Sequence, residues 1–276
     1  MMTHRNGDAG ELPPLLKKIL ENKADEVRAR KRLVSQDDIK KRSADAPPVR
    51  PFAGSVLACE SRHKIIAEIK RFSPGSSKLR RDFDPRRIAE GYEASGAAAL
   101  SVLADTVFFG GSLSIMSTAR DAVSLPVLCK EFIIDPFQIY EARAYGADAV
   151  LLMVVNFPDK ERFKEMADVA KDAGLEALLE ISDEADLEYL PRSRPSVIIN
   201  NRNFRDPDLK VDVATTTRLA PLITNPRILI SASGIQSAYE MEELQKSGVD
   251  AFLIGGRLMT EMDPAAELAR LLGKHK

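Results

Sequence analysis

Short apolar runs recur along the chain, and each run is continuous rather than alternating with polar residues. They span residues 65–69, 99–103, 126–129, 149–155, 177–181, 197–200, 227–230 and 251–254. Continuous runs of this length are typical of parallel strands that are buried on both faces. The stretches between them have helical spacing, as in residues 136–145, 160–173 and 238–246. The pattern therefore predicts strands and helices in alternation.

Several of these runs are preceded by similar segments that contain a glycine. Examples are SGAAALSVL from Ser95, YGADAVLLM from Tyr145, AGLEALLEI from Ala173 and SGVDAFLIG from Ser247. The glycine stands where a helix must end in a left-handed residue before the next strand. Eight such units in about 215 residues predict a (β/α)8 TIM barrel, whose usual length is about 250 residues. A doubly wound open sheet is the alternative, but no GxGxxG follows the first run.

The first 60 residues follow a different pattern and predict an N-terminal helical extension with a linker. Residues 12–32 have apolar positions spaced as in an amphipathic helix, and Ser35 is a good N-cap for a second helix over residues 35–43. The proline-rich SADAPPVRP that follows has the composition of a linker. The extension either packs as a solvated leader on the outside or covers one barrel mouth. Residues 61–276 are expected to form the barrel, within one structural domain overall.

Composition narrows the class of protein. Of 276 residues, 44% are hydrophobic, and 40 lysines and arginines balance 41 acidic residues, so there is no global basic field for nucleic acid. Two cysteines and three histidines are too few for a disulfide framework or a zinc cluster. No apolar run is long enough for a membrane helix, and the first residues lack the apolar stretch of a signal peptide. We expect a cytoplasmic protein with no nucleic-acid or membrane partner.

Charged side chains end the first predicted strand. In a (β/α)8 barrel the reacting groups come from the carboxyl ends of the strands and from the loops that follow them. Glu68 and Lys70 stand two positions apart at the end of the run 65–69. Alternation along a strand places both side chains on the same side, facing the barrel mouth. Taken alone, such a pair also fits an ordinary surface salt bridge.

Three further runs end in groups of the same kind, namely Lys130 after 126–129, Glu180 in 177–181, and Asn200 in 197–200 with Arg202 two residues later. Because all carboxyl ends open on one mouth of the barrel, we expect these groups to converge there. A lysine can serve as an acid in such a site and Glu180 as the base. The alternative for Glu180 is a structural partner of Lys130.

Small residues follow the last two predicted strands. The segment SASGI from Ser231 comes after the run 227–230, and Gly255-Gly256-Arg257 comes after the run 251–254. Backbone N–H groups in such turns can approach an anion, and phosphate sites of these barrels often form there. Ordinary tight turns are the alternative. The residues thus indicate a barrel enzyme for a phosphorylated small molecule, with carbonyl activation, elimination and decarboxylation all open. Metal, nicotinamide and flavin are not required, and no cofactor is expected.

Segments spread through the whole predicted barrel carry a distinctive set of motifs. They are IIAEIKRFSP from Ile65, LPVLCKEFIIDPFQIYEARAYGADAVLLM from Leu125, LLEI from Leu178, INNRN from Ile199, SGI from Ser233 and AFLIG from Ala251. Together they resemble the indole-3-glycerol phosphate synthase family of tryptophan biosynthesis. The match extends more loosely into the N-terminal helices, where the family has an extension that covers the substrate.

The activity implied by this resemblance is a decarboxylating ring closure, which makes the chain a carbon–carbon lyase (carboxy-lyase). The aromatic carbon that bears the carboxylate of 1-(2-carboxyphenylamino)-1-deoxyribulose 5-phosphate attacks the ketone, carbon dioxide leaves, and water is then lost to give indole-3-glycerol phosphate. By position, Lys130 is the general acid that protonates the ketone oxygen. Lys70 pairs with the substrate carboxylate or acts as a second acid, and Glu180 matches the acid/base glutamate.

The resemblance implies supporting roles for further residues. Glu68 would tune Lys70 and contact the substrate, Asn200 would hold a substrate hydroxyl or the aniline nitrogen, and Arg202 would support the charged network. Substrate-binding positions are also implied at the phosphate, namely Ser73, Ser233, Gly234, Gly255 and Gly256, and in the aromatic pocket, namely Phe109 and Leu151.

The chain also departs from the pattern of the family. Ala232 stands where the family normally has a glutamate, Ile199 replaces a glycine, and the loop after the first strand reads Ser73-Pro74-Gly75-Ser76. Two alternatives to the synthase activity therefore stay open: a divergent paralogue acting on a related arylamino sugar phosphate, and a catalytically silent subunit that binds a phosphorylated ligand or acts as a scaffold. Association with other enzymes of the tryptophan pathway is a further expectation.

Overall fold

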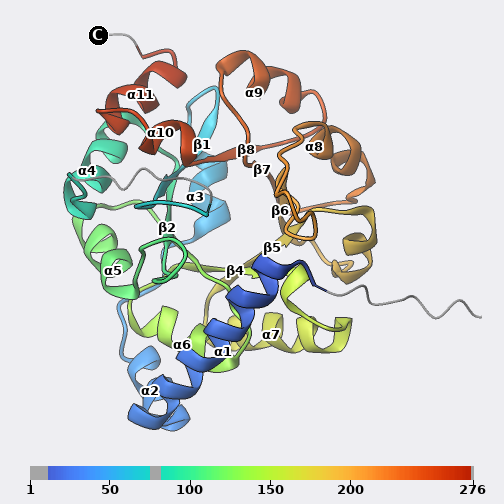
Figure 1. Cartoon of the computed structure of the whole chain (residues 1–276). Coiled ribbons are helices and arrows are strands. Elements are labelled where there is room, and N and C mark those ends of the chain that lie inside the picture. The colour runs from blue at the N-terminus through green and yellow to red at the C-terminus, as the bar shows by residue number, and fades with distance from the viewer. Residues whose placement is uncertain (1–11, 75–81, 275–276) are drawn as a thin grey trace, which may run out of the picture.

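The apolar runs form eight parallel strands that close into a barrel in chain order, from β1 next to β2 around to β8 next to β1 (Figure 1). The computed structural model describes residues 12–74 and 82–274. The strands are β1 (Lys64–Ile69), β2 (Ala99–Leu103), β3 (Val127–Lys130), β4 (Ala149–Met153), β5 (Glu176–Ile181), β6 (Ser196–Asn200), β7 (Ile228–Ala232) and β8 (Ala251–Ile254). The predicted (β/α)8 TIM barrel is confirmed, and the open sheet is excluded.

Helices lie between the strands on the outside of the barrel (Figure 1). They are α4 (Pro85–Ser95), α5 (Leu113–Ala122), α6 (Pro136–Ala144), α7 (Lys160–Asp172), α8 (Ala214–Leu219), α9 (Ala238–Gln245), α10 (Gly256–Met259) and α11 (Pro264–Leu271), with the 3-10 helices η1 (Val154–Asn156), η2 (Glu184–Tyr189) and η3 (Ala220–Leu222). Many begin at a side-chain cap; Asp135 of α6 and Ser237 of α9, for example, form capping boxes.

Two strand ends differ from the sequence prediction by two residues, whereas the other boundaries agree to within one residue. The run 149–155 was predicted as one strand, but β4 ends at Met153 and the chain continues into η1. In contrast, β7 extends two residues beyond the predicted end, to Ala232. Ala232 is thus a strand residue, which pairs in register with Asn200 of β6 and Leu253 of β8.

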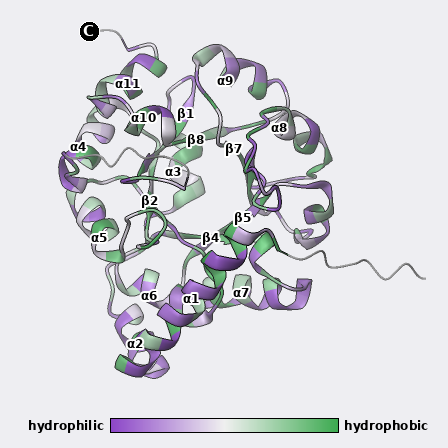
Figure 2. Cartoon of the chain, in the orientation of Figure 1, coloured by the Kyte–Doolittle hydropathy of each residue, from purple (hydrophilic) through white to green (hydrophobic). Residues whose placement is uncertain are grey.

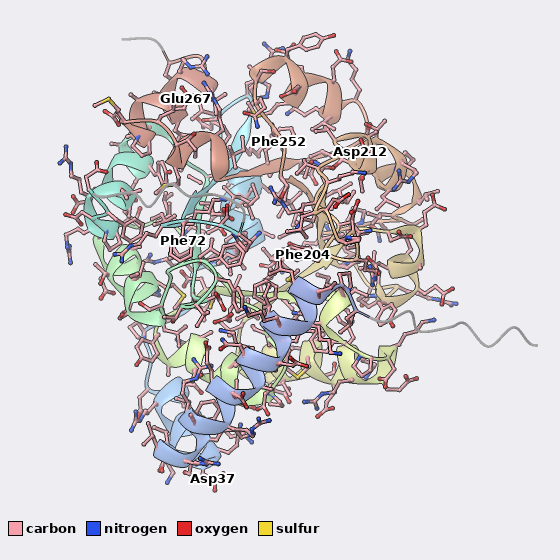
Figure 3. The ribbon with its side chains drawn as sticks, in the orientation of Figure 1. Asp37, Phe72, Phe204, Asp212, Phe252 and Glu267 are labelled. Atoms are coloured by element: carbon pink, nitrogen blue, oxygen red, sulfur yellow. The ribbon has the colours of Figure 1, made fainter. Side chains whose placement is uncertain are left out.

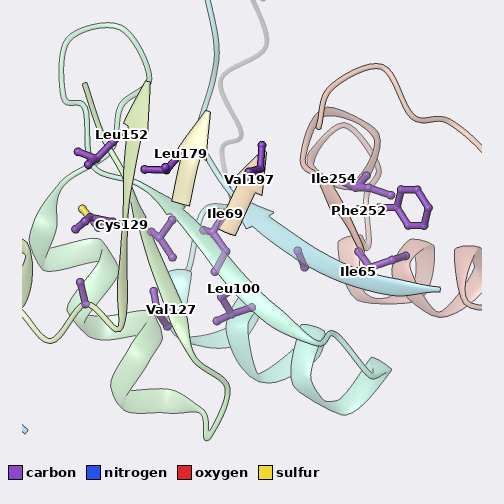
Figure 4. Close-up of a cluster of buried hydrophobic side chains, with 14 of the residues drawn as sticks. Ile65, Ile69, Leu100, Val127, Cys129, Leu152, Leu179, Val197, Phe252 and Ile254 are labelled. Atoms are coloured by element: carbon purple, nitrogen blue, oxygen red, sulfur yellow. The ribbon is translucent and has the colours of Figure 1, made fainter. Parts of the chain in front are cut away.

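Alternation along the strands sorts the apolar side chains into two buried layers. Outward-pointing side chains such as Ile65, Leu100 and Val197 pack under the helices (Figure 4). Inward-pointing ones such as Ile66, Leu178 and Ile230 fill the interior of the barrel. Because both faces of each strand are buried, the runs are continuous in sequence.

The N-terminal segment packs across one side of the barrel from one end to the other. It forms α1 (Pro14–Leu33), α2 (Gln36–Ala44) and α3 (Phe52–Ala58), and the first two carry mostly hydrophilic residues (Figure 2). The apolar positions Leu16 and Ile19 of α1 are buried against the interior cluster of the barrel, with Phe132 and Phe204. Both phenylalanines follow strand carboxyl ends, so α1 covers that mouth. Of the two expectations for the extension, the structure favours the cover over the solvated leader.

Helix α3 was missed in the sequence, where its residues fall in the predicted linker region. Phe52, Ala53 and Val56 are fully buried in the interior cluster. The backbone N–H of Ala53 donates to the carboxylate of Glu176, at the amino end of β5, over 3.1 Å. Helix α3 therefore closes the opposite, amino-terminal mouth of the barrel.

The proline-rich segment before α3 is held by a buried ion pair between Arg120 and Asp148, whose Nη2 and Oδ1 atoms lie 3.2 Å apart. The backbone N–H of Arg50 donates to Asp148 over 2.9 Å, and Arg120 donates to the carbonyl of Pro48. The segment is therefore bound to the outside of the barrel. The expected boundary between residues 60 and 61 falls between α3 and β1 and stays a prediction. Among the described residues, no helix is long and apolar enough to cross a membrane.

Candidate active site

A cavity of about 600 Å³ opens at the carboxyl ends of the strands. Every site residue predicted from the sequence lines it: Glu68, Lys70, Ser73, Phe109, Lys130, Leu151, Glu180, Asn200, Arg202, Ser233, Gly234, Gly255 and Gly256. These residues come from all parts of the barrel, since the strands that carry them converge on one mouth. Gly75 and Ser76 of the loop after β1 lie outside the described residues.

Two lysines and two glutamates form one charged cluster at the base of this cavity. Nζ of Lys70 lies 2.7 Å from Oε1 of Glu68. Nζ of Lys130 lies between two carboxylates, 3.6 Å from Oε2 of Glu68 and 3.8 Å from Oε2 of Glu180. Glu68 and Glu180 are buried, whereas the two lysines are partly open to the cavity. The ammonium groups are thus the charged groups that an incoming molecule meets first.

The two carboxylates have pKa values displaced in opposite directions. Burial alone would raise the pKa of Glu68, but the charges of Lys70 and Lys130 and their hydrogen bonds outweigh burial, so this pKa lies below its usual value. Burial also raises the pKa of Glu180, and there Lys130 and the amide of Asn200 oppose it only in part. Glu68 therefore stays ionised, while Glu180 holds a proton more readily. Such a separation is the usual basis of acid/base assignments in active sites.

The amide of Asn200 links β5 to the loop after β6. Its Nδ2 donates to Oε1 of Glu180 over 2.9 Å, and its Oδ1 accepts from the backbone N–H of Arg202 over 3.0 Å. The second carboxylate oxygen of Glu180 has no hydrogen-bond partner in the described part of the chain, although Lys130 is near. One oxygen of Glu180 is thus fixed by the protein, while the other is buried beside Lys130 and still has capacity to accept a hydrogen bond.

Small residues after β7 and β8 also line the cavity. Ser233 and Gly234 both have left-handed backbone, with φ values of 70° and 81°. Asn201 holds this turn, because its Nδ2 donates to the carbonyl of Ser233 over 2.9 Å while its Oδ1 accepts from the hydroxyl of Thr216 over 2.8 Å. The sequence did not single out Asn201, whose importance comes from a buried hydrogen-bond network between β6, β7 and α8.

An apolar wall completes the cavity. Phe109 and Leu151 were predicted there, but Phe132 and Phe204 were missed. Phe132 lies 6.0 Å from Phe109 and 5.7 Å from Phe204 between ring centroids, and the latter pair meets edge to face. Phe204 lies near the amino-terminal end of α1 in Figure 3. Flat apolar surfaces of this kind suit an aromatic ring. Phe132 could have been suspected, since it stands two residues after Lys130.

A charged cluster at the carboxyl mouth, an apolar wall and a left-handed turn of small residues together define an enzyme of the (β/α)8 barrel class. The family model described as indole-3-glycerol phosphate synthase matches residues 16–271. The chain therefore belongs to the indole-3-glycerol phosphate synthase family, as the resemblance in its motifs predicted.

Relatives with the same name support this membership. The indole-3-glycerol phosphate synthase of Laribacter hongkongensis is 40% identical over 261 residues, covering 93% of this chain and 98% of its own. The enzyme of Neisseria meningitidis serogroup C is 41% identical over 263 residues, with the same two coverages. A crystal structure of 3-hexulose-6-phosphate synthase from Salmonella typhimurium is similar with a TM-score of 0.58 at 15% identity, covering 77% of this chain and all of that one. That likeness concerns the fold alone.

Proposed function

We propose that the chain is an indole-3-glycerol phosphate synthase, which closes the indole ring of 1-(2-carboxyphenylamino)-1-deoxyribulose 5-phosphate with loss of carbon dioxide and water. The observation that carries the proposal is the cluster of Lys70, Lys130, Glu68 and Glu180 in one cavity, which is also lined by a turn suited to a phosphate. The family membership supports the same activity.

Lys130 has the position of the general acid. Attack by an aromatic carbon on a ketone develops negative charge on the ketone oxygen, and an ammonium group can protonate it. Glu68 and Glu180 hold Nζ of Lys130 from two sides, so this group points into the cavity from a fixed place. The protein thereby places a proton at the reacting carbonyl before the carbon–carbon bond forms.

Lys70 and Glu180 serve the later steps in this proposal. Lys70 contacts the substrate carboxylate, which leaves as carbon dioxide, or donates a second proton as water departs. Glu180 takes the acid/base role, because its pKa is raised, the residue lines the cavity, and one of its oxygens has no hydrogen-bond partner among the described residues. Glu68 keeps its charge and fixes Lys70, while Asn200 orients Glu180 and holds a substrate hydroxyl or the aniline nitrogen.

Binding of the two ends folds the flexible substrate. The phosphate would be held by Ser73, by the backbone of Ser233 and Gly234, and by that of Gly255 and Gly256. The aromatic ring would lie against Phe109, Leu151, Phe132 and Phe204. Fixing both ends brings the two reacting carbons together, an effect worth roughly 7 to 11 kcal/mol in the best model systems. Arg202, beside Asn200, adds positive charge at this mouth.

Ala232 is compatible with this activity. Its side chain is fully buried among the inward-pointing residues, level with Asn200. The charged cluster without a glutamate at 232 already balances two lysines with two carboxylates. A third carboxylate is therefore not needed to compensate the lysines, and neither the divergent nor the silent alternative is favoured by an observation of this structure.

The test is formation of the indole ring by the purified protein. Incubation with the aminodeoxyribulose phosphate should give a rising indole absorbance, and Lys130→Ala should reduce kcat by at least about 100-fold, a usual loss for a general acid. Lys164→Ala, which removes an exposed lysine of α7, is the control and should leave kcat unchanged. A native rate no higher than that of Lys130→Ala would refute the proposal.

The proposed activity also bears on the cellular location of the protein and on its association with other enzymes. We propose a cytoplasmic location, where both cysteines stay reduced; Cys129 is buried and Cys59 is partly exposed, and neither is in a disulfide. Association with other enzymes of the tryptophan pathway is proposed on the same ground, since they supply the substrate and use the product. Co-purification of the tagged chain with the other pathway enzymes from its own cells would test it.

A further inference from the structure

Lys23 of α1 is a charged residue with no exposed surface. Its Nζ lies 2.9 Å from Oδ2 of Asp105 and 3.0 Å from Oε2 of Glu131. It also lies 2.7 Å from Glu26, one turn further along α1. Burial alone would lower the pKa of Lys23, but Glu131 and Asp105 raise it well above its usual value, so it stays charged. A cation from the N-terminal helix thus joins the loops that follow β2 and β3.

Each of the two loop carboxylates uses its other oxygen to hold the backbone of its own loop. Oδ1 of Asp105 accepts from the N–H of Phe108 over 2.6 Å. Oε1 of Glu131 accepts from the N–H of Phe132 over 2.7 Å. Lys23 therefore binds the oxygens of two side chains that each fix a turn of loop backbone. The link runs from α1 through a carboxylate to the backbone in both loops.

Both loops carry groups of the candidate active site. Phe109 follows Phe108 directly, and Lys130 and Phe132 flank Glu131 in the chain. All three of Phe109, Lys130 and Phe132 line the cavity. Lys23 itself does not line it, so any effect of Lys23 on the reaction must pass through these loops.

We infer that Lys23 is a positioning residue of the active site, which fixes the loops after β2 and β3 so that Lys130 and the phenylalanine wall are held for ring closure. The inference rests on the proposed function for its effect on turnover, but not for its effect on the loops. It assigns α1 a part in catalysis beyond covering the mouth.

Two measurements on Lys23→Met test the inference. Hydrogen–deuterium exchange of the full chain should become at least about tenfold faster in residues 104–111 and 130–134, because Asp105 and Glu131 lose their common partner and repel each other. With the ring-closure substrate, kcat should fall at least about tenfold at a temperature where the melting curve shows the variant folded. Misplacement of reacting groups by about 1 Å is enough for such losses.

Lys31→Met is the matched control on the same helix. Lys31 pairs with Asp135 of the α6 N-cap over 2.9 Å, on the outside of the barrel and away from the cavity. This variant should leave exchange in both loops unchanged and kcat within about twofold of the native value. Equal effects of the two substitutions would mean that any weakening of the contact between α1 and the barrel has the same result, which contradicts a specific role of Lys23. Unchanged exchange in both loops of Lys23→Met would also overturn the inference.

A neutral triple variant, Lys23→Met with Asp105→Asn and Glu131→Gln, covers the case in which Lys23→Met does not fold. Of the three carboxylates around Lys23 it leaves only Glu26 charged, which is partly exposed and accepts from Asn22, and the new amides can still accept from the loop N–H groups. We expect it to fold but to keep fast loop exchange and low kcat, because no group ties α1 to the loops. If this variant has the exchange rates and the kcat of the native protein, Lys23 only neutralises Asp105 and Glu131 and does not position the loops, and the inference is refuted. If the native chain forms no indole, the proposed function fails, and the exchange results alone decide on Lys23.

Discussion

Gly255 is the residue on which the geometry of the charged cluster depends most closely. It follows β8, and its backbone lies directly against the side chain of Glu68 on β1. A methyl group added at this position would overlap Oε1 and Cβ of Glu68. That oxygen is the one that holds Lys70, so the absence of a side chain at Gly255 allows the ion pair to form. The glycine is needed for close approach rather than for an unusual backbone angle.

Gly255→Ala should therefore disable the enzyme without unfolding it. Displacement of the Glu68 carboxylate moves both lysines, and kcat/KM for ring closure should fall at least about 100-fold, as misplacement of catalytic groups typically costs. Steady-state kinetics would measure this. Gly54→Ala in α3 is the control, since a methyl group there would meet only Pro51, at an ordinary contact distance. Equal kinetics for the two variants would contradict this account of Gly255.

The sequence predicted the residues of the cavity because strand alternation and the shared carboxyl mouth are regular. Glu68, Lys130 and Glu180 could be assigned to one opening from their positions at strand ends alone. Lys23 and Asp105 could not, since their contact depends on how a separate helix docks on irregular loops. No period of the sequence specifies such a contact.

At the scale of elements, α1 and α6 share a partly buried ion pair. Arg30 of α1 lies 3.5 Å from Oε2 of Glu141 on α6. Burial raises the pKa of Glu141 to about 7; Arg30 opposes this shift, while Glu131 adds to it. Folding therefore favours the protonated form of Glu141 relative to the unfolded chain. The contribution of this group to stability is complete below its unfolded pKa and is lost as the pH rises through about 7.

Glu141→Gln should remove this dependence, since the amide carries no charge at any pH. At pH 8 the melting temperature of the variant should exceed that of the native protein. The increase should be about 2 to 4 °C for each kcal/mol gained in the free energy of unfolding, and it should shrink towards pH 5. Thermal melting at the two pH values measures the effect. Glu165→Gln, at an exposed position on α7, is the control and should show no such change between pH 5 and 8. A lower melting temperature for Glu141→Gln at pH 8 would contradict the prediction.

The type and order of the barrel elements could be read from the sequence, but their ends and one helix could not. Helix α3 has only seven residues and follows a proline-rich segment, so its apolar positions give too few repeats of a helical period. Its burial against the barrel stabilises it. The end of β4 was misjudged because the apolar run continues into η1, and apolar side chains do not distinguish a strand from a turn of helix.

At the scale of the whole molecule, Asp148 joins the N-terminal segment to the barrel. It is fully buried at the start of β4 and accepts from Arg120, from the N–H of Arg50 and from the N–H of Val127. The three donors come from α5, from the segment before α3 and from β3. One carboxylate thus connects parts of the chain that no periodic pattern relates.

Asp148→Ala should lower the free energy of unfolding by about 3 to 5 kcal/mol, because it leaves a buried guanidinium and two N–H groups without their acceptor. Urea denaturation would measure the loss. The comparison is Asp168→Ala, which breaks an exposed pair with Lys164 on α7 and should cost less than about 1 kcal/mol. Similar losses for both would show that the N-terminal segment is not anchored through Asp148.

Closure of the barrel at both mouths by one N-terminal segment has a consequence for the order of assembly during synthesis. Ala53 of α3 bonds to Glu176, and Lys23 of α1 pairs with Glu131, so neither helix has its partner until more than 100 further residues have been made. Both helices leave the ribosome before β3 and β5 do, and until then their buried apolar residues lack the surfaces that cover them in the folded chain. They dock only after β3 and β5 exist, and contacts so distant in sequence form slowly.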